Sequence, residues 1–82
     1  MNNSFYNDFA ARFAASTLTS LVESFNSQVG NRGFTSARAA HNKALIDELV
    51  RRGIDVSAVF DGTALSFAHH VELDNNRLVI KK

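Results

Sequence analysis

The chain has 82 residues, no cysteine, 45% hydrophobic residues and a formal net charge of +1 at pH 7. This length predicts a single domain over residues 1–82, and the lack of cysteine excludes disulfides, thiolate metal sites and thiol nucleophiles. The low net charge excludes a strong overall attraction to nucleic acid or to an acidic membrane.

The first predicted element is a helix over about residues 4–28, whose apolar side chains fall into two sectors about 140° apart on a helical wheel. One sector contains Phe5, Tyr6, Phe9, Ala10 and Phe13, and the other contains Leu18, Leu21, Val22, Phe25 and Val29. A straight helix cannot direct both sectors into one small core. Either the helix breaks near residues 16–20, where Ser20 and Glu23 have capping-box spacing, or its aromatic half packs on a second subunit.

The second predicted helix covers residues 35–52. Thr35 or Ser36 begins it, and Gly53 follows two arginines at its end, where cations and a left-handed glycine are both favourable. The predicted core face consists of Ala39, Leu45, Ile46, Leu49 and Val50. The far side carries Ala37, Ala40 and Ala44, which either let another helix approach closely or are simply good helix formers.

After Gly53 the apolar residues recur at every second position, which predicts strands over about residues 54–60, 63–73 and 77–81. Asp61-Gly62 and Asn75-Asn76 are suited to two-residue turns. The second turn pairs Leu73 with Leu78, Val71 with Ile80 and Asp74 with Arg77, and the first pairs Ala58 with Leu65 and Val56 with Phe67. The predicted fold is therefore α+β, with two helices packed on an antiparallel β-meander. The alternative is a helical turn over residues 56–60, which leaves only the final hairpin.

No catalytic, cofactor or metal site is predicted from the sequence, and we expect a protein that is not an enzyme. His69 and His70 are neighbours in a predicted strand, so their side chains point to opposite faces and do not chelate one ion. The serines lie in no nucleophile motif, and Gly30 and Gly33 lack the spacing of a phosphate loop.

The function that we expect is protein binding or assembly, with a second copy of the chain as the first partner. The predicted association surface consists of Phe5, Tyr6, Phe9 and Phe13. No stretch resembles a signal peptide or a membrane span, so we expect a cytoplasmic location and no membrane partner. No small-molecule ligand is predicted.

The alternative is a nucleic-acid-binding protein in which two helices and a hairpin act as a helix-turn-helix with a wing. Its predicted contacts are Arg32, Arg38, His41 and Lys43. A patch of three or four cations supports only weak, salt-sensitive binding, unless dimerisation doubles it.

Overall fold

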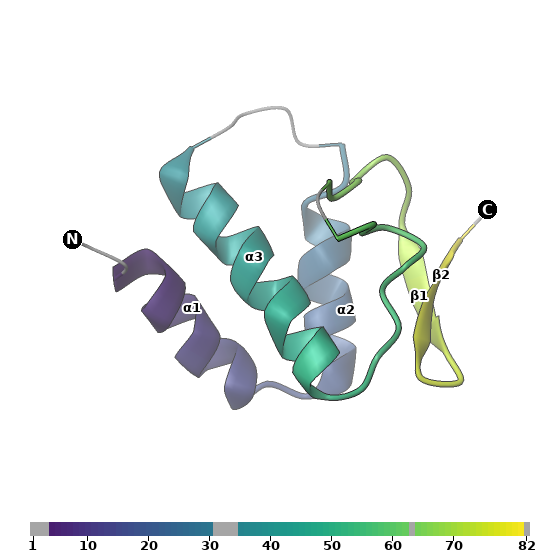
Figure 1. Cartoon of the computed structure of the whole chain (residues 1–82), viewed down its shortest axis with the longest axis horizontal. Helices are drawn as coiled ribbons and strands as arrows, with labels where there is room; N and C mark the ends of the chain where they lie inside the picture. Colours follow the sequence, from purple (N-terminus) through teal and green to yellow (C-terminus); the bar gives the residue numbers. More distant parts are fainter. Residues whose placement is uncertain (1–3, 31–34, 63, 82) are drawn as a thin grey trace.

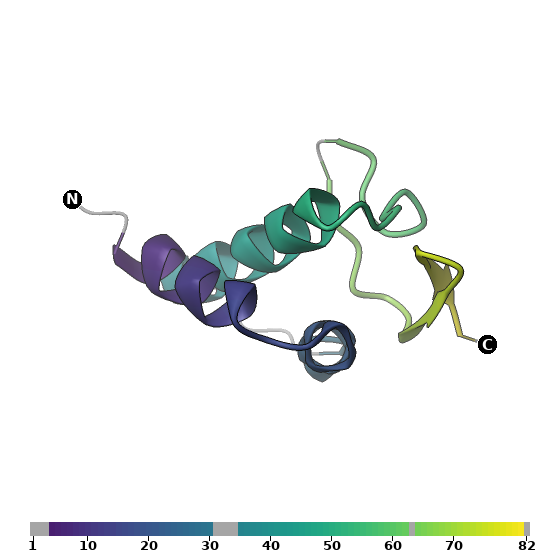
Figure 2. The same ribbon diagram turned by 90° about the horizontal axis from the view of Figure 1, so that it is seen from below.

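The computed structural model describes residues 4–30, 35–62 and 64–81, and over these residues the chain is an α+β domain. The described elements are the helices α1 (Ser4–Ala14), α2 (Leu18–Ser27) and α3 (Ser36–Arg51), followed by the antiparallel strands β1 (Val71–Asp74) and β2 (Arg77–Ile80). α1 packs mainly against α3, whereas the hairpin packs against α2 at the other end of the domain (Figure 1 and Figure 2). The predicted fold class is confirmed.

The predicted break in the first helix is also confirmed, and it separates α1 from α2. Thr17 caps α2 by accepting a hydrogen bond from the Ser20 backbone N–H at 3.1 Å, so the cap is Thr17 rather than Ser20. The break allows Phe13 from α1 and Leu21 and Phe25 from α2 to reach the same core. The two apolar sectors are therefore accommodated within one copy of the chain.

Both ends of α3 match their sequence signals. The Thr35 hydroxyl accepts a hydrogen bond from the Arg38 backbone N–H at 3.0 Å at the start of the helix. Gly53 follows the end of the helix with φ +82°, a backbone conformation that favours glycine.

The buried face of α3 is shifted from the face that the sequence predicted. The predicted core residues that are buried are Leu45, Ile46 and Leu49. The prediction is wrong for Ala39 and Val50, whose side chains are exposed. Ala44, which was placed on the far side, is 1% exposed because α1 packs there. The small alanine side chain thus lets a helix approach closely, and that helix belongs to the same chain.

Arg52 ties the ends of α1 and α3 together. The two helices run in the same direction, so their C-terminal ends lie side by side at the bottom of Figure 1. The Arg52 Nη2 donates to the carbonyl oxygens of Phe13 at 2.9 Å and Ser16 at 2.7 Å, just where α1 ends. Its Nε donates to Glu48, whose side chain is buried, at 2.6 Å. One guanidinium therefore stabilises the negative end of α1 and the carboxylate of α3.

The C-terminal hairpin has the predicted register. β1 and β2 pair Leu73 with Leu78 and Val71 with Ile80. Asn75 and Asn76 form the turn with φ of 56° and 66°, as a type I′ turn requires. Val71 and Leu78 are buried, whereas Leu73 and Ile80 on the same face are more than one-third exposed, so the helices cover only one diagonal of that face.

The rest of the predicted meander is wrong, and the alternative of a helical turn over residues 56–60 is confirmed. The backbone N–H groups of Val59 and Phe60 both donate to the carbonyl oxygen of Val56, at 3.0 and 2.9 Å. Val56 and Val59 are both buried, and alternating side chains in a strand would place them on opposite faces. The turn is therefore needed to bury both.

Of the strands predicted over residues 54–60 and 63–73, residues 54–60 and 64–70 form only isolated bridges. Asp55 bridges to Arg77 in parallel, and Phe60 pairs with Leu65, so the expected pairing of Ala58 with Leu65 is also wrong. The second predicted strand begins at Val71 rather than at residue 63.

Asn26 fastens the hairpin to α2. Its Nδ2 donates to the Val71 carbonyl oxygen at 2.9 Å, and its Oδ1 accepts from the Val71 N–H at 2.8 Å. The amide thus pairs with the backbone as a neighbouring strand would. The core lies between the helices and this hairpin, and its largest fully buried side chains are Leu21, Phe25, Leu45, Leu49, Val71 and Leu78.

Candidate binding groove

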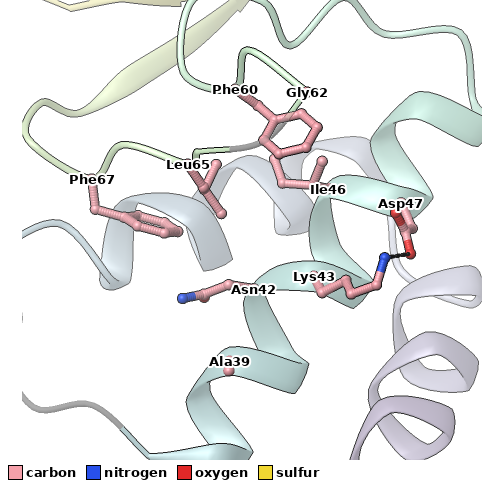
Figure 3. Close-up of a pocket in the computed structure, with 9 residues that line it drawn as sticks. All are labelled: Ala39, Asn42, Lys43, Ile46, Asp47, Phe60, Gly62, Leu65 and Phe67. Atoms are coloured by element: carbon pink, nitrogen blue, oxygen red, sulfur yellow. Dashed lines mark hydrogen bonds and ion pairs between the residues drawn. The ribbon is translucent and has the colours of Figure 1, made fainter.

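A groove of about 630 Å³ lies between α3 and the loop over residues 60–67 (Figure 3). This volume is within the range of ligand-binding sites. The side of the groove formed by α3 consists of Ala39, Asn42, Lys43, Ile46 and Asp47. The loop side consists of Phe60, Gly62, Leu65 and Phe67. The groove is largely apolar, and its polar groups all come from α3.

The loop wall is held in place by its own hydrogen bonds and by one core contact. The Ser66 N–H donates to the Val59 carbonyl oxygen at 2.8 Å, and the Asp61 carboxylate accepts from the Ala64 N–H at 2.7 Å. The Phe67 ring stacks on Phe25 of the core with 4.6 Å between centroids. The wall is therefore braced by its own hydrogen bonds and attached to the core through Phe67.

The floor of the groove is open because Ala39 is small. Ile46 closes the inner part of the floor and is only 4% exposed, whereas Ala39 is exposed. A larger side chain at position 39 would project into the groove. It would displace solvent and leave the packed core unchanged, because Ala39 is exposed.

Asn42 provides a hydrogen-bond donor whose orientation is set from α1. Its Oδ1 lies 3.1 Å from His41 Nδ1. The contact involves the amide oxygen, so the Asn42 amide N–H groups are free of this contact. The His41 ring lies edge-on to Phe9 and Phe13, with centroids 5.0 and 5.2 Å away. Figure 3 shows the amide nitrogen extending toward the Phe67 side of the groove.

Lys43, Asp47 and Tyr6 form a polar cluster at the other side of the floor. The Tyr6 hydroxyl donates to Asp47 Oδ2 at 2.5 Å, and Lys43 Nζ lies 3.3 Å from the same oxygen. The hydrogen bond to Asp47 raises the pKa of the Tyr6 phenol. The Lys43 side chain remains 70% exposed. The cluster joins α1 to α3 and holds an ammonium group beside the groove.

A second hollow adjoins the groove across Ala39 and Lys43. It has a volume of about 440 Å³ and is lined by Tyr6, Ala39, Ala40 and Lys43. Two of these residues also line the larger groove. The two hollows are therefore neighbours over the N-terminal half of α3, and the Lys43 side chain borders both.

The predicted association surface is divided between the surface and the core. Phe5 is 53% exposed, whereas Tyr6 and Phe9 are half-buried. Phe13 is 3% exposed and packs inside the domain. Phe13 is therefore not available to a partner, and only the first three aromatic residues reach the surface.

The structure describes three of the four residues predicted to contact nucleic acid. Lys43 is ion-paired with Asp47 but its side chain is 70% exposed, and His41 packs edge-on against two phenylalanine rings. Arg38 is half-buried near the start of α3, and Arg32 lies outside the described residues. Nucleic-acid binding stays a prediction.

The loop wall of the groove was not predicted as a site. Phe60 and Phe67 were placed in strands of a meander, where Phe67 belonged to the covered face. Their actual positions depend on the turn at residues 56–60. No spacing of residues in the sequence predicts that this loop lies beside α3. The preference of Val56 and Val59 for burial was the only sequence signal that favoured the turn.

The described parts of the chain form neither a metal-binding cluster nor a membrane-spanning helix. Over residues 4–30, 35–62 and 64–81, no three histidine, aspartate or glutamate side chains are placed to hold a metal ion. Within the same ranges, no helix is long and apolar enough to cross a membrane. The polar groups of the groove are an amide, an ammonium and a carboxylate, which are suited to binding and orienting a ligand.

Comparison of the chain with family models, curated proteins and solved structures finds no match.

Proposed function

We propose that this chain is a protein-binding module without catalytic activity, and that it binds through the groove between α3 and the loop over residues 60–67. The observation that supports this most directly is the lining of the groove. Phe60, Leu65 and Phe67 are half-exposed apolar side chains on a braced wall, and they face an α3 floor kept open by Ala39. Such a groove gains free energy when an apolar side chain displaces its water.

Selection from a random peptide library displayed on phage tests this proposal. The immobilised chain is expected to recover peptides that bind in the micromolar range. Ala39→Trp is expected to abolish their binding, because the indole fills the groove from an exposed position of the floor. Ala11→Trp, at an exposed position of α1, is the matched control and should bind like the unchanged chain. Recovery of no binding peptide, or equal binding by both variants, contradicts the proposal.

Self-association is the second form of protein binding that we propose, and Phe5 carries it. Phe5 is the largest exposed aromatic side chain among the described residues, and Tyr6 and Phe9 adjoin it on α1. We expect sedimentation at high micromolar concentration to detect a dimer that Phe5→Ser dissociates. A monomer at that concentration contradicts self-association and leaves the groove as the binding surface.

A further inference from the structure

We infer that the groove accepts a peptide segment in which an acidic residue lies between two apolar residues. The inference rests on the proposed function and specifies the chemistry of the partner. It is carried by the junction of the two hollows, the position of Lys43 and the donor on Asn42.

The joined hollows favour a chain over a compact small molecule. A ligand in the larger groove can continue over Ala39 into the hollow between Tyr6 and Ala40, because the two spaces share Ala39 and Lys43. The larger space is walled by phenylalanine and leucine, and the smaller one by a tyrosine ring and alanine. A peptide can thus place one large apolar side chain in the first space and a smaller one in the second.

Charge complementarity specifies the residue between them. Lys43 stands at the junction, and its ammonium has three donors, of which the contact with Asp47 uses one. The tyrosine hydroxyl also donates to Asp47, so that carboxylate does not depend on Lys43 alone for its hydrogen bonds. The segment from Ser24 to Ile46 contains no acidic residue. An incoming carboxylate is therefore favoured beside Lys43.

Asn42 supplies a contact to the main chain of the peptide. Its amide nitrogen extends on the Phe67 side of the groove, and the contact with His41 holds the amide in that orientation (Figure 3). A backbone carbonyl next to the large apolar residue is a suitable acceptor for this donor. The apolar spaces then provide affinity, while the amide and the ammonium set direction and sequence preference.

The test uses the peptides recovered by display, synthesised with a fluorescent label and measured by fluorescence polarisation. We expect most recovered sequences to carry aspartate or glutamate between two apolar residues. Lys43→Met, which keeps the aliphatic stem, should weaken their binding about tenfold, and raised salt should weaken binding to the unchanged chain. Lys81→Met, at an exposed position after β2, is the matched control and should bind normally. Thermal unfolding of each variant separates lost binding from lost folding.

The outcomes distinguish this inference from the proposed function. Peptides that Ala39→Trp excludes but that lack an acidic residue, or that bind Lys43→Met normally, overturn the inference and leave the proposed function standing. Absence of any groove-dependent peptide overturns both. A dimer of the unchanged chain that Ala39→Trp converts to monomer identifies a second copy as the occupant and also overturns the inference.

Discussion

Replacing Arg52 with methionine tests the main link between α1 and α3. The Arg52 side chain is only 23% exposed. Methionine keeps most of its apolar stem but removes the guanidinium. The change deletes the hydrogen bonds to the carbonyl oxygens of Phe13 and Ser16 and the contact with Glu48. It also leaves the buried Glu48 carboxylate with Arg51 as its remaining charged partner.

The expected loss of unfolding free energy is about 3 kcal/mol. A hydrogen bond involving a charged group contributes about 1.5–3 kcal/mol, and removing one partner of a buried ion pair costs about 3–5 kcal/mol. These terms overlap, because water partly solvates the released carbonyl groups. A domain of this length has a total stability of roughly 4–12 kcal/mol. Each kcal/mol shifts the Tm of such a domain by roughly 4–8 °C, so the expected loss lowers the Tm by roughly 12–24 °C.

Urea denaturation and thermal unfolding, both followed by circular dichroism, measure this effect. Arg51→Met is the matched control, because the Arg51 side chain is 64% exposed and donates to Glu48 rather than to the carbonyl oxygens of α1. We expect a much smaller loss for this control. Equal losses for the two variants would refute the role that we assign to Arg52 at the end of α1.

Three further predictions concern titration and the hairpin. Hydrogen bonding to Arg51 and to Arg52 lowers the pKa of Glu48, so its contribution is present above the unfolded pKa of about 4.3 and is lost as the pH falls through the folded pKa. Glu48→Gln should therefore flatten the acid limb of the stability profile, and an unchanged limb would contradict this. The pKa of Tyr6 is raised, so its contribution is present below about pH 10 and is lost as the pH rises through the folded pKa. Tyr6→Phe should remove that alkaline loss in urea titrations at several pH values. Asn26→Ala should cost roughly 1–3 kcal/mol and expose the Val71 amide to hydrogen exchange. Unaltered exchange in the alanine variant would show that the hairpin is held by packing alone.

Local signals in the sequence were sufficient for the helices and for the hairpin register. Thr35 and Gly53 marked the ends of α3, and the two asparagines at positions 75 and 76 set the turn. These features depend on residues that are close in the chain. A cap or a two-residue turn is decided by side chains and φ values within a few positions, so sequence patterns predict it well.

The tertiary structure alone decided which surface is buried and where the groove lies. Alternation after Gly53 favoured a strand, but burial of both Val56 and Val59 required a turn, and the gain from burial outweighed the local preference for a strand. Ala44 became part of the core because the break after α1 lets that helix fold back onto α3. The turn at residues 56–60 places the wall of the groove beside α3. The packing of α1 against α3 places Tyr6 beside Lys43, in the adjoining hollow. Contacts between residues so far apart in the chain depend on the packing of whole elements, which the spacing of residues within any one element does not specify.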